Sequence, residues 1–132
     1  MNVQQLLETH PRPTGDLDVV ARCIQACSDC VTSCTVCADA DLAEPDVVEL
    51  TRCIRLCLDC ADTCAATLRV VARQTTREAA PLRAMVEACR IACGYSAEEC
   101  ERHAHHHVHC RICGETCRAC EAACTALLAV IG

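Results

Sequence analysis

Apolar residues and cysteines recur along this chain at alternating intervals of four and three residues, with polar residues between them. The segment CIQACSDCVTSCTVC shows this pattern over residues 23–37, and CIRLCLDCADTC repeats it over residues 53–64. An average interval of 3.5 residues is typical of an α-helix that buries one face, whereas no segment alternates with the period of two that a strand needs. We therefore predict an all-α protein.

The first two helices have recognisable starts. TGDLD offers Thr14 or Asp16 as N-cap of a helix that runs to about Ala40. The second helix is predicted to begin at Pro45, because proline suits the first helical position, and to run to about Arg73.

The third helix is predicted to begin close to Pro81, after the polar turn RQTTREAA. The following boundary lies in ERHAHHHVHC, which contains neither Gly nor Pro, and we place the turn within residues 105–109 because the cysteine intervals slip there. A fourth helix then runs to Ile131. Short connections between helices of similar length predict an up-down-up-down four-helix bundle over residues 16–132, preceded by an N-terminal helical arm over residues 1–15.

Cysteine must supply much of the interior of this bundle. The 132 residues include 17 cysteines, one tyrosine, and no phenylalanine or tryptophan. Each helix carries one inward-facing stripe of thiols. The stripes are Cys23, Cys27, Cys30, Cys34 and Cys37, then Cys53, Cys57, Cys60 and Cys64, then Cys89, Cys93 and Cys100, and finally Cys110, Cys113, Cys117, Cys120 and Cys124.

Two ordinary explanations of these cysteines fail. A secreted disulfide framework conflicts with the odd number of cysteines, with their absence from the turns, and with a start that resembles no export signal. Buried free cysteines acting as small hydrophobic residues would account for any single position. Four whole stripes need another reason, because leucine would bury more apolar area without the risk of oxidation. The pattern therefore predicts metal binding by sulfur.

Charge and geometry favour Cu(I) among the metals that thiolates bind. A Zn²⁺ ion held by four thiolates leaves two negative charges, which is unfavourable for several sites in a dry core, and iron-sulfur clusters use loop-borne cysteine spacings that this chain lacks. A soft monovalent Cu(I) that replaces one thiol proton leaves the core neutral, so we expect multiple Cu(I) ions, roughly one per cysteine. A pair such as Cys53 and Cys57 could hold one ion linearly between sulfurs about 4.6 Å apart.

The two ends of the bundle differ in character. One end is predicted to be aliphatic, formed by Val19, Val20, Leu68, Val71, Leu82, Met85, Val86, Leu127 and Leu128. The opposite end is predicted to be polar, with Cys37, Asp41, Asp46, Glu49, His103, His107 and Cys110. His103 and His107 continue the cysteine stripe, and imidazole binds copper, so both are candidate ligands at the entry. His105, His106 and His109 are left open between a metal role and a solvated turn, and Ser96 interrupts the third stripe.

Charge and hydropathy limit the partners. A formal net charge of −6 with no lysine argues against nucleic acid, and no apolar run is long enough for a membrane span. Without an export signal the chain is expected in the cytoplasm. Copper ions, brought by a donor protein or a small thiol, are the expected partners.

Inward-facing CxxxC and CxxC repeats on four helices, with a histidine-rich segment before the last, resemble the cytosolic copper storage proteins. The resemblance covers residues from about Asp16 to Ile131 and implies a homotetramer that stores Cu(I) on the cysteines named above. The alternative is a metallothionein-like reservoir or detoxifier for Zn, Cd or Ag. A redox enzyme is disfavoured, because no single exposed CxxC pair stands beside a βαβ pattern, and we expect no catalytic activity.

Overall fold

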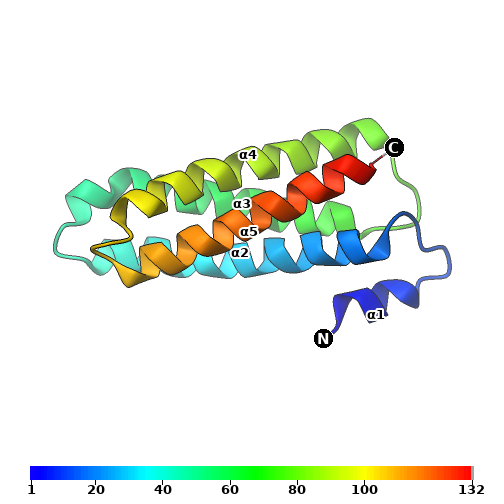
Figure 1. The fold of residues 1–132 in the computed structure, drawn as a ribbon, viewed down its shortest axis with the longest axis horizontal. Coiled ribbons are helices and arrows are strands. Elements are labelled where there is room, and N and C mark those ends of the chain that lie inside the picture. Colours follow the sequence, from blue (N-terminus) through cyan, green and yellow to red (C-terminus); the bar gives the residue numbers. More distant parts are fainter. Residues whose placement is uncertain (132) are drawn as a thin grey trace.

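The computed structural model describes residues 1–131, and within them every long element is helical (Figure 1). The elements are α1 (Val3–Glu8), α2 (Leu17–Ala43), the 3-10 helix η1 (Val47–Leu50), α3 (Thr51–Ala72), α4 (Ala79–His103) and α5 (Val108–Val130). The predicted all-α class is confirmed.

The four long helices form an antiparallel bundle in which each helix packs against two neighbours. Helix α2 packs against α3 and α5, and α4 packs against the same two helices, so the order around the bundle follows the chain (Figure 1). This is the predicted up-down-up-down arrangement. The short helix α1 lies on the outside of the bundle against α2, with Leu7 buried.

The start of α2 agrees with its sequence signals. Asp16 is the N-cap, and its Oδ1 accepts a hydrogen bond from the backbone N–H of Val19 at 3.3 Å. Thr14 instead donates its backbone N–H to Oε1 of Gln74 at 3.0 Å, which ties the segment before α2 to the connection between α3 and α4. Between them, Gly15 turns the chain with a φ of 76°, a conformation that favours glycine.

One predicted boundary was wrong, and a second differs by one to two residues. Helix α3 does not begin at Pro45 but at Thr51, because Pro45 enters a turn that continues as η1 and buries Leu50 completely. The break before the last helix spans residues 104–107 instead of 105–109, and α5 already begins at Val108. The other ends agree within three residues.

The bundle has the two different ends that the sequence predicts. At one end Val20, Val71, Val86 and Leu127 are at most 1% exposed, which closes the bundle with aliphatic side chains; we call this the aliphatic end. The helices α2 and α4 finish and α5 starts at the opposite end (Figure 1). Acidic side chains and histidines gather there, and we call this the polar end. None of the helices within residues 1–131 has the length and apolar character needed to cross a bilayer.

Candidate metal centre

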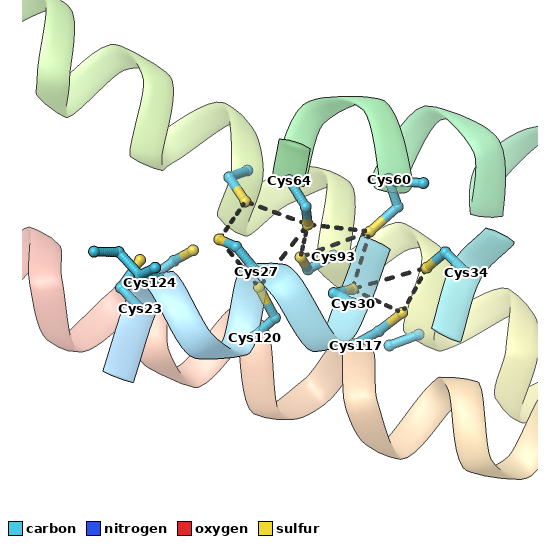
Figure 2. Close-up of a cluster of buried hydrophobic side chains, with 14 of the residues drawn as sticks. Cys23, Cys27, Cys30, Cys34, Cys60, Cys64, Cys93, Cys117, Cys120 and Cys124 are labelled. Atoms are coloured by element: carbon cyan, nitrogen blue, oxygen red, sulfur yellow. Dashed lines mark hydrogen bonds between the residues drawn. The ribbon is translucent and has the colours of Figure 1, made fainter. Parts of the chain in front are cut away.

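The cysteine stripes of α2, α3, α4 and α5 meet along the bundle axis. All 17 cysteines are free thiols, and each is at most 1% exposed. Neighbouring sulfurs lie 3.5–4.0 Å apart, both within a helix and between helices. Figure 2 shows the resulting chain of contacts, which passes from Cys27 through Cys120, Cys64, Cys60 and Cys30 to Cys34. The interior is a continuous column of sulfur.

The column contains several groups of four ligand atoms that could surround one ion. In each group, all four ligand atoms lie within 4.8 Å of one another. From the aliphatic end toward the polar end the groups are Cys27, Cys89, Cys120 and Cys124; Cys30, Cys64, Cys93 and Cys120; Cys30, Cys34, Cys60 and Cys117; and Cys37, Cys57, Cys100 and Cys113. The first and second groups share Cys120, the second and third share Cys30, and the third and fourth are joined by a contact of 3.7 Å between Cys34 and Cys113, so an ion in one group is close to ligands of the next.

The distances between the sulfurs indicate which coordination geometries the column could give a bound ion. Three sulfurs around one ion at about 2.3 Å lie about 4.0 Å apart, four lie about 3.8 Å apart, and two on opposite sides lie about 4.6 Å apart. Cys53 and Cys57 are 4.0 Å apart, as suits thiols that share a hydrogen bond. A linear site on this pair therefore requires the two sulfurs to move apart by about 0.6 Å, whereas the groups of four sulfurs include pairs already at the tetrahedral spacing, such as Cys30 and Cys34 at 3.8 Å.

Hydrogen bonds between neighbouring thiols raise the pKa of one partner and lower that of the other, so Cys30, Cys60 and Cys120 have a lowered pKa. Hydrogen bonds with neighbouring thiols, followed by burial, raise the pKa of Cys34, Cys64 and Cys124 above the usual range. Neutral thiols can pack in an apolar core, while an array of thiolates could not. Metal binding must therefore displace protons from the column.

Ser96 occupies the gap in the stripe of α4. Its hydroxyl is fully buried and lies 3.8 Å from Cys57 Sγ, 3.9 Å from Cys34 Sγ and 3.5 Å from Cys117 Sγ. The position faces the column, but it offers oxygen where its neighbours offer sulfur, and it belongs to none of the groups described above.

At the polar end a further group combines Cys37, Asp41, His109 and Cys110. His109 Nδ1 lies 3.4 Å from Cys37 Sγ and 3.7 Å from Cys110 Sγ. Its Nε2 lies 2.8 Å from a carboxylate oxygen of Glu44. A carboxylate on one imidazole nitrogen fixes the ring so that the other nitrogen faces the metal position, as is usual for metal-binding histidines.

The electrostatics of this last group differ from those of the column. Burial raises the pKa of Asp41 to about 7, and the carboxyl is fully buried with Oδ1 3.5 Å from Cys110 Sγ. Hydrogen bonds with Cys37 and Cys53 lower the pKa of Cys110 to about 3. Cys110 is therefore the thiolate that a cation reaching the polar end would meet.

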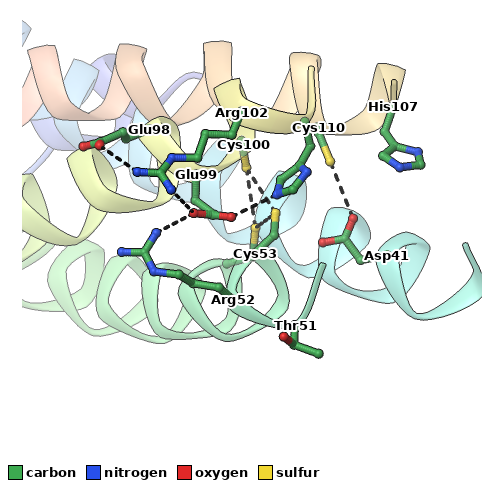
Figure 3. A network of polar contacts seen from close by, with 12 residues as sticks. Asp41, Thr51, Arg52, Cys53, Glu98, Glu99, Cys100, Arg102, His107 and Cys110 are labelled. Atoms are coloured by element: carbon green, nitrogen blue, oxygen red, sulfur yellow. Dashed lines mark hydrogen bonds and ion pairs between the residues drawn. The ribbon is translucent and has the colours of Figure 1, made fainter. Parts of the chain in front are cut away.

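The two histidines predicted as ligands face carboxylates instead of sulfur. His103 ends α4, and its Nε2 lies 2.9 Å from Glu99, which is only 4% exposed and also pairs with Arg52 (Figure 3). His107 lies between Glu44 and Asp46, with its nitrogens 2.7 Å and 3.0 Å from their oxygens. His105 and His106 are exposed. His109, which the sequence left open, is the histidine that contacts the sulfurs.

This all-helical fold with a sulfur-lined interior defines a thiolate metal-binding bundle with room for several ions. The chain belongs to the copper storage protein (Csp) family, which it matches over residues 17–129.

Solved structures of a relative agree with this assignment. The copper storage protein Ccsp from Streptomyces lividans, in a structure loaded with 10 copper equivalents, is 48% identical, with a TM-score of 0.94 over 97% of this chain and 98% of that one. A structure of the cytosolic Ccsp with five coppers is 50% identical, with a TM-score of 0.86 over 87% of this chain and 96% of that one. A histidine-to-alanine variant of Ccsp is also 50% identical, with a TM-score of 0.87 over 89% of this chain and 98% of that one. None of the curated proteins compared with the chain matches it.

Proposed function

We propose that this protein stores and buffers copper in the cytosol by binding many Cu(I) ions to the thiolates of its 17 cysteines. The observation that carries the proposal is the continuous column of buried, mutually contacting sulfurs. It is supported by membership of the copper storage protein family and by the copper-loaded structures of the cytosolic Streptomyces protein. The family is one of storage proteins, not of enzymes.

Neutrality of the core sets the expected capacity. Each Cu(I) that replaces one thiol proton leaves the charge of the column unchanged, whereas each Zn²⁺ held by four thiolates adds two negative charges. Capacity should therefore approach one Cu(I) per cysteine. His109 joins Cys37 and Cys110 as a ligand at the polar end. His103 and His107 remain proposed ligands that must first leave their carboxylate partners.

Titration of the reduced protein with Cu(I) against a competing chelator tests this function. We expect saturation near 17 ions per chain, the number of cysteines, with roughly one proton released per ion bound. Saturation near one ion per four cysteines would contradict the neutrality argument.

A reservoir for zinc or another soft divalent metal is the second candidate. It is favoured by the groups of four sulfurs, which lie within 4.8 Å of one another and include pairs at 3.5 Å and 3.8 Å, close to the ~3.8 Å edge of a tetrahedral site. Metal analysis of protein purified from copper-fed and from zinc-fed cells separates the two. The homotetramer expected from the resemblance also remains a proposal, which sedimentation analysis of the reduced protein would check.

A further inference from the structure

A separate pocket lies at the aliphatic end of the bundle, where α2 and α4 begin and α5 finishes (Figure 1). Its volume is about 230 Å³, which is the space of about eight water molecules at ~30 Å³ each. The pocket is lined by Thr14, Gly15, Asp16, Val20, Arg77, Ala79, Leu82, Leu127, Val130 and Ile131. These residues include no cysteine or histidine, so the pocket is not part of the metal centre.

The inner wall of the pocket is aliphatic. Val20 and Leu127 are 1% exposed and Leu82 is 5% exposed, so an apolar group held there would lie against side chains that are shielded from water. Asp16 and Ala79 also line the pocket but are exposed, so a small solute can enter beside them. The pocket therefore offers apolar contact inside and access from solvent outside.

Arg77 supplies this pocket with a cation that has an unused donor. Its Nη2 donates a hydrogen bond to the backbone carbonyl of Val71 at 2.9 Å, whereas its Nε is buried and has no hydrogen-bond partner. Burial lowers the pKa of the guanidinium, as is expected for a cation that loses water without gaining a counter-ion. An unpaired buried donor on a charged group is unfavourable, and a ligand with a negatively charged oxygen would satisfy it.

Arg77 has no counter-ion in the part of the chain that the structure describes. None of the ion pairs within residues 1–131 involves it. Other arginines without an ion pair in the same range are Arg12, Arg69, Arg73 and Arg83, but all of them are exposed to water. Arg77 is partly buried, so its charge is the one that most needs a partner.

The start of α4 adds free donors beside Arg77. No side chain caps this helix, and its first residue, Ala79, lines the pocket. The first N–H groups of α4 and the positive end of its dipole therefore face an anion bound there. The start of α2 differs, because Asp16 accepts a hydrogen bond from the backbone N–H of Val19 as its N-cap.

We propose that this pocket binds a small monocarboxylate with a short aliphatic chain, such as butyrate. The carboxylate accepts hydrogen bonds from Nε of Arg77 and from the first N–H groups of α4, and the carbon chain lies against Val20, Leu82 and Leu127. Butyrate is short enough for a pocket of about 230 Å³, whereas drug-sized ligands occupy about 300–1,000 Å³. This site goes beyond copper storage, because none of its ligand groups is a thiolate.

Titration of the full-length, reduced protein with butyrate, followed by ligand-observed NMR, tests the site. We expect a dissociation constant on the order of 1 mM for so small a ligand. Arg77→Gln removes the charge and should weaken binding at least about tenfold, since hydrogen bonds to charged groups are stronger than neutral ones. Arg73→Gln is the matched control and should bind like wild type, because Arg73 is exposed in the same connection and does not line the pocket.

A second variant keeps the test independent of any damage to the fold by Arg77→Gln. Ala79→Leu retains Arg77 and its contact with Val71 but fills the pocket, so it should weaken butyrate binding about tenfold with an unchanged circular dichroism spectrum. 1-Butanol has the same carbon chain without the charge and should bind at least about tenfold more weakly than butyrate. Wild-type affinity in Arg77→Gln or Ala79→Leu, equal binding of butanol and butyrate, or no binding of butyrate to wild type would overturn the proposal.

Discussion

Burial of the Asp41 carboxyl makes the stability of the metal-free protein depend on pH in a defined direction. Asp41 is fully buried, one of its oxygens has no hydrogen-bond partner, and its pKa is raised from 3.8 to about 7, first by burial. Below pH 4 the carboxyl is protonated in both the folded and the unfolded chain. Between pH 4 and 7 the unfolded chain releases the proton while the folded chain keeps it, so stability falls as the pH rises.

The magnitude follows from the size of this shift. A difference of about three pKa units corresponds to about 4 kcal/mol, and relaxation around the carboxyl at the polar end reduces this to roughly 2–4 kcal/mol. Asn resembles the protonated carboxyl, so Asp41→Asn should be more stable than wild type by this amount at pH 8. The advantage should vanish near pH 4.

Urea denaturation of both reduced, metal-free proteins at unit steps between pH 4 and 8 measures the difference. Asp39→Asn, at an exposed position on the same helix, is the control and should change stability by less than about 0.5 kcal/mol at each pH. If the stabilities of wild type and Asp41→Asn run parallel across the range, the burial argument is wrong.

Three further predictions concern the fold and the polar end. The metal-free, reduced protein should give a strongly helical circular dichroism spectrum, because its neutral thiols already pack; a coil spectrum would refute this. His109→Ala should slow Cu(I) uptake more than the double substitution of His103 and His107 by alanine, as measured by stopped flow, and the reverse order would assign entry to the bundle axis. Leu127→Ala at the aliphatic end should lower the free energy of unfolding by about 2–5 kcal/mol without faster uptake, and faster uptake would show that this end also admits copper.

The sequence was sufficient to predict the bundle because the spacing of the cysteines matches the period of an α-helix. A stripe with an average interval of 3.5 residues specifies both the helix and the face that it buries, and every one of the 17 cysteines is buried accordingly. The aliphatic end could be predicted in the same way, by extending each stripe. The start of α3 could not, because the turn after Pro45 and the tight η1 depend on how Leu50 fits the end of the core.

The histidines show where sequence periodicity loses its predictive value. His103 and His107 share a face only if one helix includes both, but α4 ends at His103 and His107 has extended backbone angles. His109 was identifiable in principle, since it precedes Cys113 by four residues on the helix that begins at Val108. To tell which histidine contacts the sulfurs, one needs to know where that helix starts and where Glu44 lies. Glu44 comes from a distant connection and contacts both His107 and His109.

The closed aliphatic end has a consequence for the order in which stored copper becomes available. A column with one accessible end and a sealed opposite end releases first the ions that arrived last, provided that the ions do not exchange places faster than they leave. Copper bound early, near Cys23 and Cys124, would then be a long-term reserve, and copper near Cys37 a rapidly available fraction. Loading with one copper isotope and then with another, followed by partial removal with a chelator, would reveal this order as an excess of the second isotope in the first ions released.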